Sequence, residues 1–289
     1  MLRRLGSALT AVLLAITVAV ISPHVATAAP ATPDTAPSPC PQPHPWPAGA
    51  SQPAVVAQLA RTTGIRLVGP DWRDPAYLPM IRVVWQTLDV LACTDYLHHI
   101  TALHPDFTLN AAPISGWAWG DWGLTRRGAV TLDFAKWRRA RADHDDGRMV
   151  RLLVHELAHA WATDRGATGY WATFQHLDAR LGPISPYGAR AVTENFSEIV
   201  GYYVGRCARD NPYDTGRYAA YYAFVRQTVF GGREFGPAPG RAPDCSDPGS
   251  ARIVPTPVSG SPAAGRGPAS PAGHLPPGEL RRPPGHRPL

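Results

Sequence analysis

This sequence of 289 residues has no closely spaced cysteines and no internal repeats, and its one long apolar run lies in the first thirty residues. No two of its four cysteines have C-x-x-C spacing, which argues against a zinc–thiolate site. Beyond the first thirty residues, no apolar stretch approaches the roughly 20 residues that a membrane-spanning helix needs. We therefore expect no transmembrane segment in that part of the chain and no repeat architecture.

Positive charge is also scarce where the chain is expected to fold. The formal net charge is +6, and Lys136 is the single lysine among 28 basic residues. Two arginines near the N-terminus contribute +2, and residues 246–289 contribute +3 through five arginines, one Asp and one Glu. The rest of the chain is close to neutral, so we expect no phosphate-binding surface and no nucleic-acid partner.

A secretory signal peptide is indicated over residues 1–29. A basic start is followed by an apolar run over residues 8–21, and small residues then precede a cleavage site at residue 28 or 29. The alternative, an uncleaved membrane anchor, needs a longer apolar run. We expect a secreted protein, extracellular or associated with the cell wall, with no membrane contact after cleavage. The abundance of Arg, Ala, Pro and Gly is typical of a GC-rich bacterial genome.

Proline-rich segments flank the part of the chain that we expect to fold. Residues 30–50 are predicted to be a Pro-rich linker, and residues 246–289 hold eleven prolines and seven glycines, a composition typical of disorder. Residues 51–245 are long enough for one sizeable core. Two roles stay open for the tail: association with the cell wall, or a spacer.

The even number of cysteines in an exported chain indicates two disulfide bonds. Four cysteines allow three pairings, and the sequence does not choose among them. We favour Cys40–Cys93 together with Cys207–Cys245, because each bond would fix a Pro-rich end to a helical segment.

The hydrophobic pattern predicts an α+β fold in which helices dominate. Apolar residues alternate over 128–134, which is typical of a half-buried strand, and shorter strands are indicated at 65–68 and 107–109. Residues 116–123, rich in Gly and Trp, are expected to form a turn region. Helical spacing predicts helices over residues 53–64, 75–93, 148–163, 170–181, 192–207 and 218–230.

The segment His155-Glu156-Leu157-Ala158-His159 carries the clearest chemical signal. Residues four apart share one face of a helix, so the two imidazoles would point to a common position, where they can bind one Zn²⁺. Glu156 lies beside that position, where its carboxylate would take a proton from a water molecule at the metal. The alternative is a helix with two hydrogen-bonded core histidines and a surface glutamate.

A later helix supplies further carboxylates. Two of the five glutamates, Glu194 and Glu198, are four residues apart in the helix predicted over 192–207. Carboxylates on one helix face repel each other unless a cation compensates them. Either they form a solvated polar stripe, or Glu194 is the third zinc ligand and Glu198 orients a ligand histidine by a hydrogen bond.

H-E-x-x-H followed on a later helix by E-x-x-x-E resembles the gluzincin metallopeptidases. Tyr187, seven residues before Glu194 in a segment S-P-Y-G, is similar to the group that includes the catalytic domain of anthrax lethal factor and the bacterial Pro-Pro endopeptidases. The resemblance covers residues 155–203. It implies a helix-rich, zincin-like α+β domain with a small sheet, whose edge strand lies above the H-E-x-x-H helix.

The resemblance also implies roles for single residues. Glu156 would be the general base, Tyr187 would donate a hydrogen bond to the oxyanion at the scissile carbonyl, and Glu198 would support a ligand histidine. Several gluzincins have an aspartate three or four residues after the second histidine, whereas Asp164 follows it by five, and its role stays open. One Zn²⁺ per chain would be held by His155, His159 and Glu194.

The expected substrate is a protein or peptide that lies extended across the zinc helix. We assign residues 128–134 as the edge strand that pairs with the substrate backbone, with Val130 and Leu132 as substrate-binding residues. The alternative is an ordinary structural strand. The tryptophans at positions 117, 119 and 122 would line a subsite or belong to the core.

The sequence therefore predicts a monomeric, secreted zinc endopeptidase that hydrolyses peptide bonds by Glu-assisted attack of water. Two alternatives stay open. A peptidoglycan peptidase or amidase of the cell wall would use the same metal site, and a non-catalytic wall-associated binding protein would use the tail. Glu156 argues against the last, because metal binding alone needs no general base.

Overall fold

The structure is a computed structural model that describes residues 44–245. Contacts divide the chain after Pro37, and every described residue belongs to the second unit. The predicted signal peptide and the predicted disordered tail lie outside the described residues. Cys93 is disulfide-bonded, but its predicted partner Cys40 is also outside them. In the part of the chain that is described, no helix is long and apolar enough to cross a bilayer.

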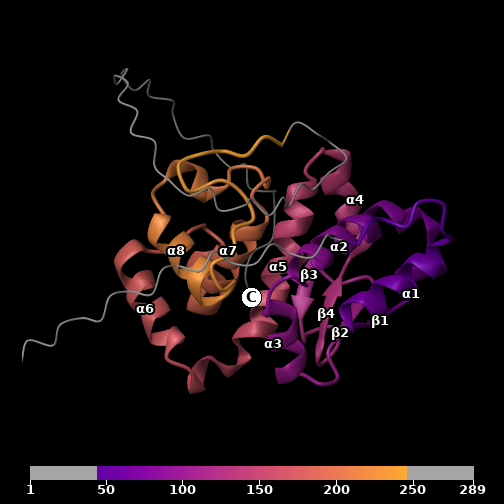
Figure 1. Ribbon diagram of the computed structural model, residues 1–289, viewed down its shortest axis with the longest axis horizontal. Helices are drawn as coiled ribbons and strands as arrows, with labels where there is room; N and C mark the ends of the chain where they lie inside the picture. The colour runs from indigo at the N-terminus through magenta and orange to yellow at the C-terminus, as the bar shows by residue number, and fades with distance from the viewer. Residues whose placement is uncertain (1–43, 246–289) are drawn as a thin grey trace, which may run out of the picture. The chain divides into compact units, whose positions relative to one another are not determined.

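Helices and one small sheet form a mixed α+β domain, as the sequence predicts (Figure 1). The strands are β1 (Arg66–Val68), β2 (Thr108–Ala111), β3 (Gly120–Trp122) and β4 (Ala129–Leu132). The α-helices are α1 (Gln52–Thr63), α2 (Leu78–Leu91), α3 (Tyr96–Leu103), α4 (Phe134–Ala142), α5 (Asp146–Trp161), α6 (Tyr170–Leu181), α7 (Val192–Val204) and α8 (Ala219–Thr228).

The strand order determines which backbone edge is open. The order is β1-β2-β4-β3, with β1, β2 and β4 parallel and β3 antiparallel to β4. The prediction that residues 128–134 form an edge strand is wrong, because β4 is paired on both sides and the edge strands are β1 and β3. Val130 and Leu132, predicted to bind substrate, are 0% exposed and belong to the core.

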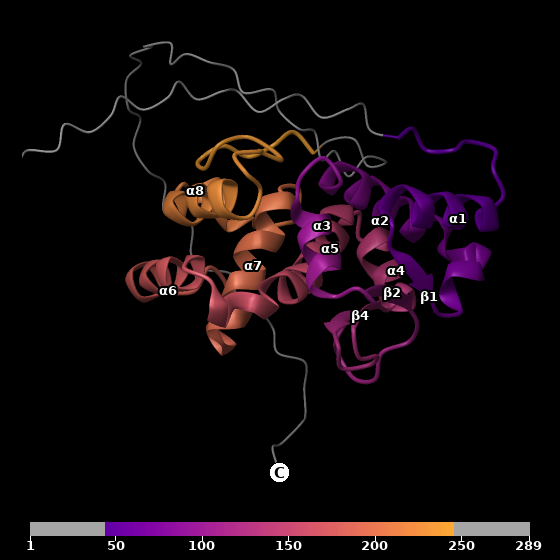
Figure 2. The same cartoon turned by 60° about the horizontal axis from the view of Figure 1, so that its bottom comes forward.

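The helix α5 lies between the sheet and the group α6, α7 and α8 (Figures 1 and 2). It contacts β3 and α2 to α4, and it packs most extensively on α7. Its first turn is capped by the Asp145 side chain, which accepts a hydrogen bond from Arg148 N. The apolar residues of α5 recur every three or four positions and are buried, among them Met149, Leu153 and Leu157.

Two glycines let α7 approach the backbone of α5. A Cβ at Gly201 would lie 2.9 Å from the carbonyl oxygen of Arg151, and one at Gly205 would lie 2.9 Å from Arg151 Cα. Both separations are too short for a side chain, so only glycine fits. The glycines are one helical turn apart and form a strip of close contact between the two helices. This strip fixes the position of the α7 carboxylates opposite the α5 histidines.

Aromatic rings fill the space around α7. Tyr203 stacks on Phe230 with ring centroids 5.3 Å apart. On another side of α7, Phe196 contacts Trp161 of α5 at 5.8 Å and Phe174 of α6 at 5.2 Å. These contacts hold α7 against both α5 and α6, since aromatic pairs bury large apolar areas.

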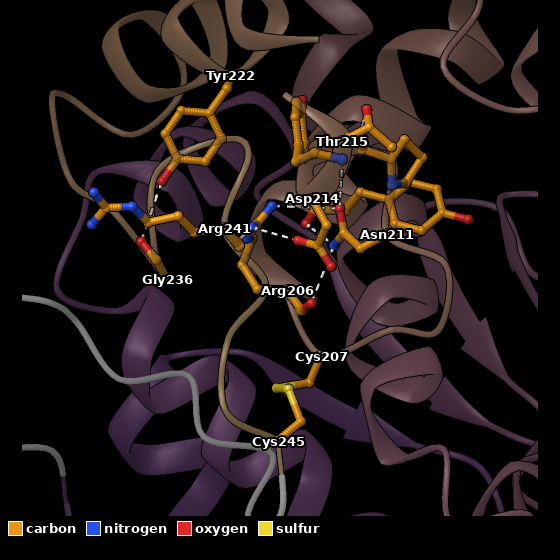
Figure 3. Close-up of polar contacts among 12 residues, drawn as sticks. Arg206, Cys207, Asn211, Asp214, Thr215, Tyr222, Gly236, Arg241 and Cys245 are labelled. Atoms are coloured by element: carbon orange, nitrogen blue, oxygen red, sulfur yellow. Dashed lines mark hydrogen bonds and ion pairs between the residues drawn. A yellow bond between two sulfur atoms is a disulfide. The ribbon is translucent and has the colours of Figure 1, made fainter. Parts of the chain in front are cut away.

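A disulfide bond and a buried arginine fix the C-terminal end of the domain (Figure 3). Cys207 and Cys245 form a disulfide, which is one of the two predicted bonds. The neighbouring Arg206 is 3% exposed. Its guanidinium donates hydrogen bonds to Asp214 Oδ1 at 2.7 Å and to the carbonyl of Arg241 at 2.9 Å. The segment after α8 is thereby tied to the end of α7.

The single lysine fixes the loop that leads into β3. Lys136 Nζ donates to the carbonyls of Ile114 at 2.6 Å and Ala118 at 2.7 Å, and lies 3.1 Å from Asp133 Oδ2. The adjacent carbonyl of Trp119 accepts from the backbone of Asp133. The loop before β3 is thus fixed by Lys136 of α4 and by Asp133, the N-cap of that helix.

Replacing Gly201 by alanine is expected to lower the free energy of unfolding by about 1–3 kcal/mol, the usual effect of overpacking. The added Cβ would push α7 away from α5. Urea unfolding followed by circular dichroism measures the change. Gly166→Ala is the control, since a Cβ there meets nothing within 4 Å. Equal unfolding midpoints for Gly201→Ala and the wild type would contradict the close contact.

Candidate metal centre

Three side chains from α5 and α7 converge on one point. His155 Nε2 and His159 Nε2 are 3.2 Å apart. Glu194 Oε2, from the first turn of α7, lies 3.1 Å from His155 Nε2 and 3.3 Å from His159 Nε2. The sequence predicts this set, and the three residues could hold a metal ion.

The spacing of these three atoms fits a tetrahedral ion. Metal–ligand bonds of about 2.0–2.1 Å at tetrahedral angles separate the ligand atoms by roughly 3.3 Å. The observed separations of 3.1–3.3 Å agree with that value. Two imidazole nitrogens and one carboxylate oxygen would therefore be the protein ligands of such an ion.

Burial and mutual contacts shift the pKa values of the three groups. Burial alone would lower the pKa of His155, but hydrogen bonds to Glu194 and Glu198 raise it to about 9. Burial lowers the pKa of His159. Burial would raise the pKa of Glu194, but its bonds to both histidines hold it below the usual range. The carboxylate is therefore ionised and available as an anionic ligand.

Glu156 lies beside the three converging residues, below the edge strand. Its side chain is 7% exposed, and burial raises its pKa to about 7. A Cβ at Gly120 of β3 would lie 2.9 Å from Glu156 Cγ. The absence of a side chain at Gly120 therefore leaves the space that the Glu156 carboxylate occupies.

Glu198 connects three parts of the site. It is 1% exposed, it pairs with Arg151 of α5, and it accepts a hydrogen bond from Ser185 Oγ at 2.6 Å. Its Oε1 lies 3.1 Å from His155 Nδ1. The alternative of a solvated polar stripe is wrong, because Glu198 is buried and its charge is compensated by Arg151.

Tyr187 lies on the far side of the same cluster. Its ring centroid is 5.6 Å from that of His155 and 6.0 Å from that of Trp117. Burial, reinforced by Glu194 and Glu156, raises the pKa of Tyr187 to about 12. The hydroxyl therefore stays protonated at neutral pH and can donate a hydrogen bond.

Asn195, which was not among the predicted site residues, positions the segment that carries Tyr187. The buried side chain accepts from Ile184 N at 2.8 Å and donates to Asp178 Oδ1 at 2.6 Å and to Tyr221 at 3.1 Å. The sequence signal that could have indicated this role is the position of Asn195, a polar side chain between the candidate ligand Glu194 and the apolar residues of α7. Arg151 and Ser185, the partners of Glu198, were missed as well.

A cavity of about 370 Å³ opens beside the cluster. One wall is formed by the loop 117–119 and Gly120, and the opposite wall by Tyr187 and Tyr202. The floor is the face of α5 that carries Glu156. Two of the three tryptophans considered as subsite residues, Trp117 and Trp119, line this cavity, whereas Trp122 packs on Phe107 and His104.

The edge strand β3 presents free backbone groups next to this cavity. The Trp119 carbonyl and the Gly123 amide bond to residues at the two ends of β4. Antiparallel pairing alternates, so the N–H and C=O groups of Gly120 and Trp122 point to the open side. A chain extended along this edge would meet two backbone donors and two acceptors.

Asp164, whose role stayed open, has partners at the C-terminal end of α5. Tyr170 donates a hydrogen bond to its Oδ1 at 3.2 Å, and His99 Nε2 lies 3.5 Å from its Oδ2. These contacts join α3, the turn after α5 and α6. The aspartate thus has a structural role in the described part of the chain.

No known protein family, curated protein or solved structure matches this chain. The arrangement of His155, Glu156, His159 and Glu194 is therefore the basis on which a function is proposed.

Removal of the α7 carboxylate is expected to abolish metal binding. Glu194→Ala leaves two nitrogen donors, so metal affinity should fall by more than about 100-fold, the upper range for groups that only support a ligand. Metal analysis of the dialysed protein by mass spectrometry measures this. The control is Glu234→Ala, which removes a carboxylate paired with Arg226 instead. Full occupancy in Glu194→Ala would remove Glu194 from the ligand set.

Proposed function

We propose that the protein is a secreted zinc endopeptidase of the gluzincin type, with His155, His159 and Glu194 as the ligands of one Zn²⁺. The triangle of donor atoms with sides of 3.1–3.3 Å carries this proposal. Two imidazoles and one carboxylate, with a fourth position left open, are the ligands of catalytic rather than structural zinc sites. The signal-peptide pattern and the Cys207–Cys245 disulfide support secretion.

A zinc ion held by these residues would supply an activated water and Lewis-acid assistance at the scissile carbonyl. Glu156 supplies the proton transfer. Its carboxylate accepts a proton from the attacking water and then delivers it to the leaving nitrogen. The position of Glu156, next to His155 and close to Gly120 of β3, supports this role because a peptide paired with β3 would lie near the carboxylate.

Tyr187 and the edge strand act on the substrate. The protonated hydroxyl of Tyr187 donates a hydrogen bond to the carbonyl oxygen as negative charge develops on it. The outward backbone groups of Gly120 and Trp122 hold the substrate extended by β-augmentation, the task first assigned to residues 128–134. Glu198, anchored by Arg151, keeps the His155 ring in its orientation.

Glu156→Gln is expected to retain zinc and to lower kcat by about 10²–10⁴-fold, the usual contribution of a general base. The amide keeps the shape of the side chain but accepts no proton. Hydrolysis of a mixed peptide library, together with zinc content, measures both effects. Glu234→Gln serves as the control. Wild-type turnover in Glu156→Gln would contradict the mechanism.

Tyr187→Phe is expected to lower kcat by about 10²–10³-fold, as removal of one oxyanion donor does. KM and zinc content should change little, because the ring and its contacts with Trp117 remain. Steady-state kinetics on one cleaved peptide separate the two parameters. A rise in KM at constant kcat would assign Tyr187 to substrate binding instead.

A further inference from the structure

The floor of the cavity is one stripe of α5 that leads away from the metal cluster. Arg148, Leu152 and Glu156 are spaced four residues apart, so they share one face of the helix, and all three line the cavity. The axial distance from Glu156 to Arg148 is about 12 Å. A substrate side chain that enters next to Glu156 therefore passes Leu152 and points to Arg148.

Arg148 has no counter-ion in the described part of the chain. Its guanidinium lies over the Trp119 ring, 4.0 Å from the ring centroid, and none of the ion pairs among residues 44–245 includes it. The other arginine of the cavity, Arg151, is neutralised by Glu198. Partial burial and the neighbouring Arg151 lower the pKa of Arg148, and Asp145 and Asp143 act in the opposite direction.

The surroundings of Arg148 add to the positive potential. It lies in the first turn of α5, where the helix dipole places partial positive charge. Of the nearby acidic groups, Asp145 caps the helix through Arg148 N, and Asp146 pairs with Arg141. Asp143 acts on Arg148 without an ion pair between the two side chains. Cations are usually placed at the opposite end of a helix, so the helix dipole does not favour an arginine here, and a bound anion would compensate its charge.

We propose that this cavity receives a substrate side chain next to the scissile bond and that Arg148 makes it select Asp or Glu. The inference rests on the proposed peptidase function and adds the substrate class. Leu152 and the Trp119 ring contact the methylene groups of that side chain. The carboxylate then forms paired, charge-assisted hydrogen bonds with the guanidinium. A Lys or Arg side chain in the same place would bring two cations together in a partly dehydrated space.

Cleavage of a peptide library by the full chain tests the selection. The wild type should enrich Asp and Glu at one position beside the cleaved bond. Arg148→Gln should lower kcat/KM for a Glu peptide relative to its Gln counterpart by about 10- to 100-fold, the range for a hydrogen bond to a charged group. Arg148→Lys should keep part of the preference, and Arg148→Glu should shift it to Lys and Arg.

The matched control is Arg138→Gln. Arg138 is an exposed arginine of α4 whose guanidinium also lies over an aromatic ring, that of Tyr77. The substitution should leave the cleavage profile unchanged. Zinc content and circular dichroism of each variant show that the site and the fold are intact. Cleavage without preference for Asp or Glu, or an acidic preference that persists in Arg148→Gln, would overturn the inference.

Capture of the same library on the immobilised Glu156→Gln chain separates this inference from the proposed function. Capture needs no turnover, so it reports on the cavity alone. If the captured peptides are enriched in Asp and Glu, and the enrichment disappears when Arg148→Gln is added, the inference is supported. Absence of hydrolysis by the wild type would count against the peptidase proposal only. Capture without enrichment of Asp or Glu would overturn the inference and would not count against the peptidase proposal.

Discussion

The candidate metal site depends on the close packing of α7 on α5. Its donor atoms come from two helices, so their separation is set by how near the two backbones lie. Gly201 and Gly205 have no side chain that would keep the two backbones apart. The aromatic contacts of Phe196 and Tyr203 hold α7 against the neighbouring elements. The position of Glu194 is thereby determined by the packed core, and the site is organised before a ligand arrives.

Buried charge around the centre is compensated within the protein. A buried carboxylate is strongly destabilising unless a partner and hydrogen bonds replace its hydration. Glu198 has Arg151, Ser185 and the His155 ring, and Glu194 has both imidazoles. The Arg148 guanidinium differs, because among the described residues it lies against an aromatic ring and forms no ion pair. This contrast is the reason for proposing that Arg148 binds a substrate and does not maintain the site.

The local parts of the site could be predicted from residue spacing. The approach of Glu194 to the histidines, which is non-local, was predicted through the family resemblance, and the other non-local parts were not predicted. His155 and His159 share a face because four residues make about one turn, and the same spacing relates Glu194 to Glu198. The edge strand was misassigned because strand order depends on pairing between distant segments. Gly120–Trp122 has only three residues and a turn-like composition, whereas residues 128–134 alternate clearly but lie inside the sheet. The helices α3 and α4 were not predicted either, since short helices carry little periodicity.

The disulfide between Cys207 and Cys245 makes the fold sensitive to its redox environment. The two residues are 38 positions apart, and closing a loop of that length in the unfolded chain stabilises the native state by about 4 kcal/mol in the chain-entropy description. The loop contains α8, which packs on α7, and Cys207 follows α7 almost directly. A reducing compartment would therefore weaken the support of the helix that carries both carboxylates, so the redox state of this cysteine pair is coupled to the geometry of the candidate site.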